Sequence, residues 1–330
     1  MNWRRAPLGV LALVTNVMVR AWFVPLIVLA ILTMSAADAP RVLSQELGRP
    51  TFTSGAELVV VHVTVKDRRG AYVTSLSREA FQVFEDGHPQ RIDFFTGEDS
   101  PITVGFLLDN SGSMREGRTR VIAAVTAFAG SSDSQDELFA LAFNEHVRPT
   151  LPPSMPFTSS PDVLRASLVS ALSTLGLTAM HDAISNGLSH VARGSNPRRA
   201  LIVVGDGGDN ASTTTFEQVL RKAQASNAAI YTVGVIDPLE RHANPTLLKR
   251  LALTTGGESF FPRRLDQVED VFRKIGHDVR NSYTLGYVSS KQARDGQYRQ
   301  IRVAVTDPAR GALSVRTRDG YRAGGAWPKP

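Results

Sequence analysis

Apolar and amphipathic stretches alternate through the middle of the chain. Apolar runs at residues 102–108, 138–143, 201–204 and 230–236 have the length of buried strands. Residues 147–151 and 258–261 predict two further short strands, the first of them antiparallel at a sheet edge. Apolar residues three to four positions apart predict helices at residues 119–129, 161–172, 179–191, 216–225, 245–253 and 265–280. This alternation predicts an α/β fold of the Rossmann-like type, with a mostly parallel central sheet and helices on both of its faces.

Both flanks of this region are rich in β-branched and aromatic residues instead. Before it, residues 58–66 predict a strand, and residues 81–85 and 91–95 predict a hairpin around Asp86-Gly87. After it, the predicted strands are residues 282–288, 298–306 and 313–317. The later strands are too apolar for a solvated tail, so we expect the two flanks to pack together as one small β-rich domain. The expected division is an N-terminal β segment at 54–98, the α/β domain at 99–280 and a C-terminal β segment at 281–325.

The first 37 residues have the pattern of an export signal. Arg4 and Arg5 precede an apolar run at residues 21–34, and small residues follow at 35–39. That run is short for a membrane span, which needs about 20 residues. Because residues 8–19 are also largely apolar, a cleaved signal peptide and an uncleaved signal anchor both stay open, and residues 38–53 predict a linker. The pattern indicates an exported protein, periplasmic or extracellular, with anchoring to the inner membrane as the alternative.

Charge and cysteine content narrow the classes of function. The formal net charge is +6, but no dense block of Lys and Arg with interleaved aromatic residues occurs, so nucleic-acid binding is unsupported. Arg302, Arg316, Arg318 and Arg322 crowd the C-terminal strands and are expected on a solvated strand face. The absence of cysteine excludes disulfides and thiolate metal sites.

Oxygen-bearing side chains follow two of the predicted buried strands. Asp109, Ser111 and Ser113 form an Asp-x-Ser-x-Ser run directly after the first strand, and Asp206 follows the third. Thr178 stands between them in the chain, where a loop turns into a helix. Because the carboxyl ends of parallel strands line one rim of the sheet, we expect these side chains to meet there. Carboxylates and hydroxyls are hard oxygen donors, which suit Mg²⁺ or Mn²⁺.

These five residues, in this order, resemble the metal-ion-dependent adhesion site of the von Willebrand factor type A (VWA) domain family. The resemblance implies one divalent ion, Mg²⁺ or Mn²⁺, with Ser111, Ser113 and Thr178 as direct ligands and Asp109 and Asp206 often acting through water. It also implies that a protein partner supplies a Glu or Asp side chain to the metal. The expected function is therefore metal-dependent protein binding at the cell envelope or outside the cell, and not catalysis.

Two further features qualify the resemblance. Gly205 stands where the family more often has Thr or Ser before the last Asp, which removes no ligand but loosens the loop. The flanking β segments, with the run Tyr283-x-Leu285-Gly286-Tyr287, resemble those of exported bacterial VWA-related proteins of the kind abundant in Acidobacteria. That likeness implies the same order of signal, β segment, VWA domain and second β segment.

Other functions have less support in the residues. The chain has no His-Glu-x-x-His run, phosphate-binding loop or Gly-x-Ser-x-Gly elbow. A Mg-dependent hydrolase or phosphatase with Asp109 as nucleophile would carry a second Asp two residues later, where this chain has Ser111. An envelope scaffold with a purely structural metal is the other alternative. Asp182 and Asp209 are expected mainly to be solvated or to favour a helix start, with support of the site as the alternative. His181 is expected to be an exposed helix residue, with a place at the rim as the alternative.

Overall fold

The computed structural model of the chain describes residues 58–97, 100–172, 176–236, 243–291 and 294–324. All of these residues lie in one compact unit, Pro50–Pro330. The predicted signal segment and linker fall outside the described residues, so they stay predictions. Within the described ranges, no helix is both long enough and apolar enough to cross a membrane.

Six strands of the described chain form the central sheet, and they are β5 (Ile102–Asp109), β6 (Glu137–Phe143), β7 (Val147–Pro149), β8 (Arg198–Gly205), β9 (Ala229–Gly234) and β10 (Ser259–Phe260). Their order across the sheet is β10-β9-β8-β5-β6-β7. Neighbours are parallel except for β7, which pairs antiparallel with β6 as predicted. Every residue of β5, β8 and β9 is buried, which is typical of a parallel sheet covered on both faces.

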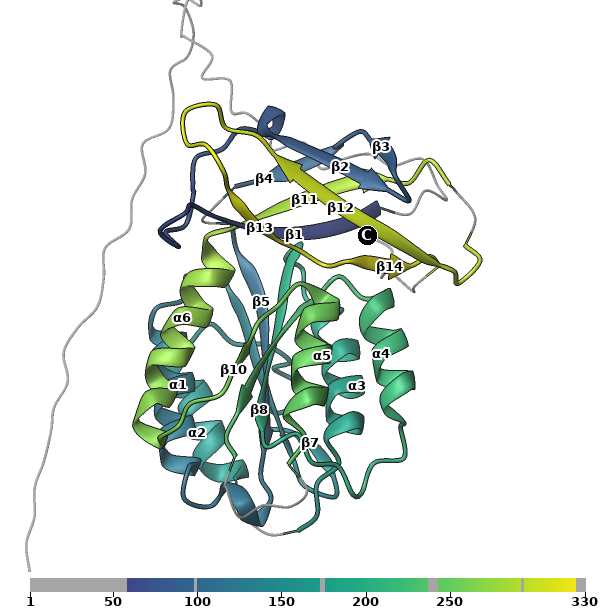
Figure 1. Cartoon of the computed structure of the whole chain (residues 1–330). Helices are drawn as coiled ribbons and strands as arrows, with labels where there is room; N and C mark the ends of the chain where they lie inside the picture. Colours follow the sequence, from purple (N-terminus) through teal and green to yellow (C-terminus); the bar gives the residue numbers. More distant parts are fainter. Residues whose placement is uncertain (1–57, 98–99, 173–175, 237–242, 292–293, 325–330) are drawn as a thin grey trace, which may run out of the picture. The chain divides into compact units, whose positions relative to one another are not determined.

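Helices cover both faces of this sheet, and the described ones are α1 (Arg118–Gly130), α2 (Pro161–Ala171), α3 (Met180–Val191), α4 (Phe216–Ala225), α5 (Pro245–Thr255) and α6 (Val268–Arg280). One core cluster joins α1, α2 and α6 to one face, and a second cluster joins α3, α4 and α5 to the other (Figure 1). Gly256 ends α5 with a φ of 80°, a left-handed conformation in which glycine has no steric penalty. All six described helices begin and end within three residues of the positions that the apolar spacing predicts.

The described parts of the flanking segments form two antiparallel sheets of four strands each. The first has the order β13-β1-β11-β4, with β13 (Ser314–Arg316), β1 (Leu58–Lys66), β11 (Ser282–Val288) and β4 (Phe94–Thr96). The second has the order β14-β12-β2-β3, with β14 (Gly320–Arg322), β12 (Tyr298–Val305), β2 (Phe81–Glu85) and β3 (His88–Gln90). Each sheet pairs strands from before and after the α/β region, and one core cluster lies among them. The predicted fold class, with its flanking β segments, is confirmed.

The predicted hairpin in the N-terminal β segment is wrong in its second strand. Asp86 and Gly87 take positive φ values of 47° and 82°, so they make a two-residue turn and β3 begins at once at His88. The residues expected to complete the hairpin instead lead into β4, which pairs with β11 in the other sheet. The short strand β14 was not predicted.

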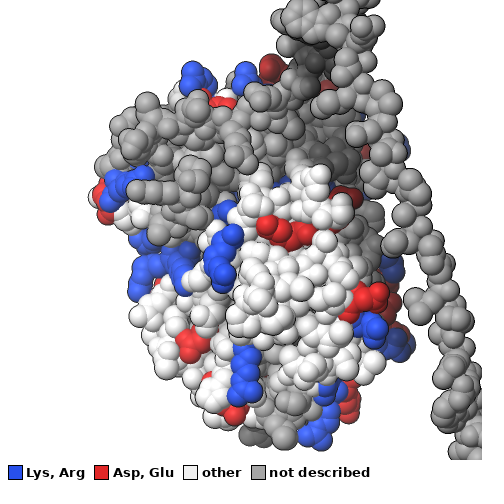
Figure 2. Space-filling model, turned by 180° about the vertical axis from the view of Figure 1, so that it is seen from behind, with Lys and Arg blue, Asp and Glu red and all other residues white. Residues whose placement is uncertain are grey.

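Charge is distributed differently from the sequence-based expectation. On the face shown in Figure 2, Lys and Arg side chains lie in small groups among uncharged and acidic residues. Two of the C-terminal arginines expected on a solvated face point inward instead. Arg318 is 5 % exposed and donates to the carbonyl oxygens of Gln224 and Ser226 at 2.6 Å each. Arg316 donates to the carbonyl oxygen of Gly256 at 2.6 Å and pairs with the buried carboxylate of Asp278. These contacts join the β strands to the α/β domain.

Candidate metal centre

The candidate site lies where two adjacent strands send their helices to opposite faces. Asp109 ends β5, and Asp206 directly follows β8, its parallel neighbour. The next α-helix after β5 is α1, on one face of the sheet, and the next after β8 is α4, on the other. In parallel α/β sheets such a point leaves a crevice at the carboxyl ends of the strands, where ligands bind.

A chain of hydrogen bonds connects four of the five predicted ligands. The Ser111 amide donates to Asp109 Oδ1 at 2.8 Å. The hydroxyl oxygens of Ser111 and Ser113 lie 3.1 Å apart, and Ser113 Oγ donates to Asp206 Oδ2 at 3.3 Å. The other oxygen of Asp206 accepts from the Gly208 amide at 2.8 Å. The two loops therefore bring two carboxylates and two hydroxyls into one cluster.

Both carboxylates of this cluster are buried without a cationic partner among the described residues. Asp109 and Asp206 are each 6 % exposed, whereas Ser113 is exposed. Burial and, to a smaller extent, the charge of Asp206 raise the pKa of Asp109 to about 6, against the hydrogen bonds from Ser111. The cluster therefore holds negative charge that water and neighbouring residues compensate poorly.

Gly205 gives the Asp109 carboxylate the space that it occupies. A Cβ atom at position 205 would lie 3.1 Å from Asp109 Oδ2 and 3.1 Å from Asp109 Cβ. Such contacts are tighter than ordinary van der Waals packing, so a side chain at this position would displace the carboxylate. The departure from the family pattern thus lies directly against a predicted ligand.

Thr178 belongs to the same rim through its backbone. The Thr178 amide donates to Asn210 Oδ1 at 2.8 Å. The amide before it, of Leu177, donates to Glu145 Oε2 at 3.1 Å, and the amide after it, of Ala179, donates to the carbonyl of Asn144 at 2.7 Å. None of the hydrogen bonds among the described residues involves the Thr178 hydroxyl. The structure therefore fixes the position of this residue but does not join its hydroxyl to the other four predicted ligands.

Asp209 and Asp182 both accept hydrogen bonds from other parts of the chain, in addition to any contact with solvent or with the start of a helix. Asp209 Oδ2 accepts from the His181 amide at 2.7 Å and from Ser212 Oγ at 2.6 Å. Asp182 accepts from the Thr213 and Thr214 amides at 2.9 Å each. Burial alone would raise the pKa of Asp182, but the hydrogen bonds from these threonines lower it. Both carboxylates therefore tie the start of α3 to the loop after β8.

His181 contradicts its predicted exposure. Its side chain is 13 % exposed, its ring centroid lies 5.8 Å from that of Phe216, and Nδ1 lies 3.4 Å from Asp209 Oδ2. Sequence reasoning also missed Asn210 and Glu145, which bind amides 32 residues away in the chain. No motif marks such residues, because each acts through a backbone group that only the fold brings close.

The donor set at the rim fits a hard divalent cation. The cluster offers two carboxylates and two hydroxyls, the oxygen ligands that Mg²⁺ and Mn²⁺ prefer, and Thr178 is the fifth predicted ligand. The first loop also buries Asn110 Oδ1 without a hydrogen-bond partner in the described part of the chain. The same residues contain no group of three or more His, Asp or Glu side chains that could hold a metal, so a site richer in carboxylate or imidazole finds no support there.

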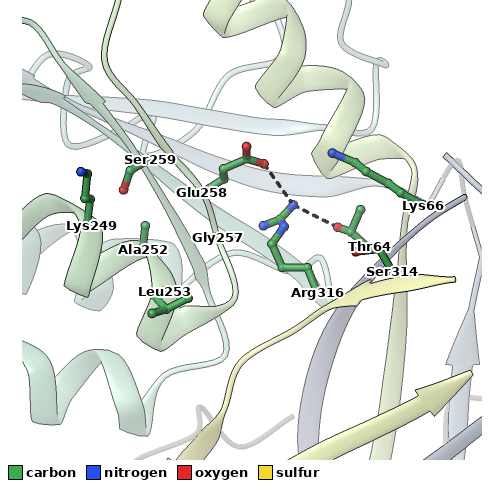
Figure 3. Close-up of a pocket in the computed structure, with 10 residues that line it drawn as sticks. All are labelled: Thr64, Lys66, Lys249, Ala252, Leu253, Gly257, Glu258, Ser259, Ser314 and Arg316. Carbon is green, nitrogen blue, oxygen red and sulfur yellow. Dashed lines mark hydrogen bonds and ion pairs between the residues drawn. The ribbon is translucent and has the colours of Figure 1, made fainter. Parts of the chain in front are cut away.

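A separate cavity of about 530 Å³ lies where α5 and β10 face β1 and β13 (Figure 3). Arg316 lies within it, 3.2 Å from Thr64 Oγ1 and 3.9 Å from Glu258. None of its lining residues is among the five candidate ligands. The cavity therefore belongs to the junction between the α/β region and the flanking β strands and not to the candidate metal centre.

Comparison with solved structures gives several matches of low identity. A von Willebrand factor type A protein from Catenulispora acidiphila is 13 % identical, with 82 % of this chain and 75 % of that chain covered and a TM-score of 0.48. An aerotolerance-related membrane protein from Bacteroides fragilis is 15 % identical, with 54 % and 98 % covered and a TM-score of 0.44. Proximal thread matrix protein 1 from the mussel byssus, with a zinc-occupied MIDAS motif, is 15 % identical, with 55 % and 48 % covered and a TM-score of 0.46. Similarities at this level carry no information on what the present chain binds.

Family comparison gives a more direct result. No curated protein matches the chain. The family model of the von Willebrand factor type A domain matches residues 103–274, which is just over half of the chain and spans β5 to α6. The chain therefore belongs to the von Willebrand factor type A domain family.

Proposed function

We propose that this protein is a metal-dependent protein-binding module. Asp109, Ser111, Ser113, Thr178 and Asp206 would hold one divalent cation, Mg²⁺ or Mn²⁺, and a partner protein would supply a Glu or Asp side chain to it. The observation that carries the proposal is the hydrogen-bonded cluster from Asp109 to Asp206, whose buried carboxylates have no cationic partner among the described residues. Membership of the VWA family supports an interaction module in preference to an enzyme.

The mix of ligands favours binding of a partner over a closed structural site. A divalent cation takes about six oxygen ligands. Hydroxyl ligands are neutral, so an ion held directly by Ser111, Ser113 and Thr178 keeps most of its positive charge. Ser113 is exposed at the rim, which leaves that side of the site accessible. An acidic side chain from outside would gain both a direct metal bond and the attraction of opposite charges in a crevice of limited hydration.

The place of action belongs to the same proposal. The basic start, apolar run and small residues of the first 37 positions support export to the periplasm or cell exterior, with the N-terminal segment as signal peptide or anchor. Residues 54–98 and 281–325 would then form a β-rich domain between the membrane-proximal linker and the VWA domain.

The test has a metal stage and a partner stage. Calorimetric titration of Mn²⁺ and Mg²⁺ into the full chain should show one site, which Asp109→Asn abolishes. Envelope proteins that the chain captures should be released by a chelator and should bind Thr178→Val at least tenfold more weakly. Asp270→Asn, at an exposed position on α6, serves as the control that keeps both properties. Capture that is indifferent to chelator and to Thr178→Val would leave the envelope-scaffold alternative as the better one, and a chain that binds neither metal would end the proposal.

A further inference from the structure

The backbone around Thr178 is held by two different loops. The amide of Leu177 is bound by Glu145 and that of Ala179 by the carbonyl of Asn144, both in the segment after β6. The amide of Thr178 itself is bound by the Asn210 side chain, in the loop after β8. Three consecutive amides are thus engaged, while the Thr178 hydroxyl makes no hydrogen bond with the described residues. The arrangement fixes the peptide and leaves the side-chain oxygen available.

Asn210 binds both the backbone amide and the backbone carbonyl of Thr178. Its side-chain Oδ1 accepts from the Thr178 amide at 2.8 Å, and its backbone amide donates to the Thr178 carbonyl at 2.9 Å. The Ala211 amide donates to that carbonyl as well, at 3.1 Å. Asn210 lies four positions after Asp206 in one short loop, so these bonds connect the fourth predicted ligand with the fifth.

The loop that carries Asn210 is anchored independently of it. Asp209 binds the His181 amide, and Asp182 binds the amides of Thr213 and Thr214. These contacts lie on either side of Asn210 and hold the loop against the start of α3. Removing the Asn210 side chain should therefore free the Thr178 amide, while the loop and its backbone bonds to the Thr178 carbonyl stay in place.

We infer that Asn210 is a positioning residue for the metal centre, which sets the Thr178 hydroxyl relative to Asp206 without touching the ion. This role rests on the proposed function, because it concerns the affinity of the same site. A metal site demands ligands within a few tenths of an ångström of their ideal positions, and residues that orient the ligands usually contribute to affinity for that reason. The Asn210 side chain is exposed, so water competes for its bonds and the expected effect is moderate.

The experiment measures Mn²⁺ affinity of the full chain by calorimetry. Asn210→Ala should weaken binding about threefold to tenfold, the range expected for one lost hydrogen bond that orients a ligand. Thr178→Val should weaken it by at least as much. The double variant should be no weaker than Thr178→Val within about twofold, because a residue that acts through a hydroxyl has no effect once that hydroxyl is gone. Asn210→Asp keeps the acceptor oxygen and should bind Mn²⁺ at least as well as the unaltered chain.

A second readout needs no metal. Hydrogen exchange in a chelator should show the Thr178 amide losing protection in Asn210→Ala but keeping it in Thr178→Val. Asn196→Ala is the matched control, since Asn196 donates to the carbonyls of Ile102 and Gln135 and likewise joins distant loops. It should lower stability to urea as much as Asn210→Ala does and leave Mn²⁺ affinity unchanged.

The outcomes separate this inference from the proposed function. If the unaltered chain binds Mn²⁺ and Asn210→Ala binds it equally well, the positioning role is overturned while the metal site stands. Additive losses in the double variant would also overturn it, because Asn210 would then act on the ion by another route. If the unaltered chain does not bind Mn²⁺ at all, the proposed function fails and the role of Asn210 fails with it.

Discussion

Buried carboxylates occur at both ends of the α/β domain, but their surroundings differ. At the junction with the β strands, Asp278 accepts from Tyr231 at 2.6 Å and Tyr72 at 3.1 Å and pairs with Arg316. At the rim, the hydrogen bonds that Asp109 and Asp206 accept from described residues come from amides and hydroxyls. Burial costs a charge much free energy unless an opposite charge offsets it. The junction offsets that cost with residues of the chain itself, whereas at the rim no cationic side chain of the described residues does so.

Removing the positive charge of Arg316 at the junction should have the largest effect on stability. Arg316→Met leaves Asp278, whose side chain is 1 % exposed, without its closest positive partner. We expect a loss of about 3 kcal/mol in the free energy of unfolding, as for other broken buried ion pairs. Urea unfolding in the Asp278→Asn background gives the check, because there Arg316→Met should cost much less. An equal cost in both backgrounds would mean that Arg316 acts through Thr64 and Gly256 and not through charge.

Removing one carboxylate charge at the rim should raise the stability of the metal-free protein. Asp109→Asn should raise the melting temperature in chelator, because it deletes one of two buried, mutually repelling carboxylates. With Mn²⁺ at ten times the dissociation constant, the unaltered chain should gain about 1.4 kcal/mol and Asp109→Asn should gain nothing. Differential scanning calorimetry with and without the ion measures both effects. A metal-induced shift that persists in Asp109→Asn would place the ion elsewhere.

Acid should weaken the junction through His62 on β1. Its ring nitrogens lie 3.3 Å from Thr284 Oγ1 and 2.9 Å from the Asn227 carbonyl. Burial, together with the charges of nearby arginines, first Arg198, lowers the pKa of His62 to about 3. The unfolded chain takes up this proton near pH 6.5 and the folded chain does not, so this contribution to stability is lost as the pH falls from about 6.5 towards 3.

The comparison variant for this prediction is His62→Gln, which cannot be protonated. Its free energy of unfolding, measured from pH 7 to pH 4, should depend less on pH than that of the unaltered chain. Parallel curves for the two proteins would assign the acid sensitivity to other groups.

Adding a methyl group at position 205 should have the smallest of these effects, and it should act on metal affinity. Gly205→Ala places a Cβ 3.1 Å from Asp109 Oδ2, so the carboxylate must move by a few tenths of an ångström. We expect Mn²⁺ affinity to fall about twofold to fivefold, with little change in stability in chelator. Gly130→Ala, where an added Cβ meets nothing within 4 Å, is the control. Unchanged affinity in Gly205→Ala would show that the Asp109 carboxylate accommodates the shift.

The sequence predicts those parts of the structure that depend on local periodicity. Buried runs such as β5 and amphipathic segments such as α4 are recognisable because burial of one face requires a regular apolar spacing. The order of Asp109, Thr178 and Asp206 along the chain points to one rim because parallel strands end on the same side. These inferences need no knowledge of contacts between distant side chains.

Contacts that depend on tertiary structure were not predictable in this way. Arg318 and Asn210 both bind backbone groups, and backbone carbonyls and amides carry no sequence signature. His181 occupies a helix position that periodicity alone leaves on the surface, yet Phe216 and Asp209 cover it. The second strand of the hairpin was predicted wrongly for a related reason, because the partner of β4 is β11, nearly 200 positions later.

The pairing of β1 with β11 has a mechanical consequence. The register runs from Leu58 opposite Val288 to Thr64 opposite Ser282, and Ser282 lies two positions after the end of α6. If the chain is held before Leu58 and a partner pulls on the rim, the two strands are drawn in opposite directions along their common axis. All seven pairings then bear the load together in shear, and none can open first as in a zipper. Forced unfolding is governed by the rate of crossing the unfolding barrier, so this antiparallel pair would act as a tether that resists tension between the N-terminal segment and a bound partner.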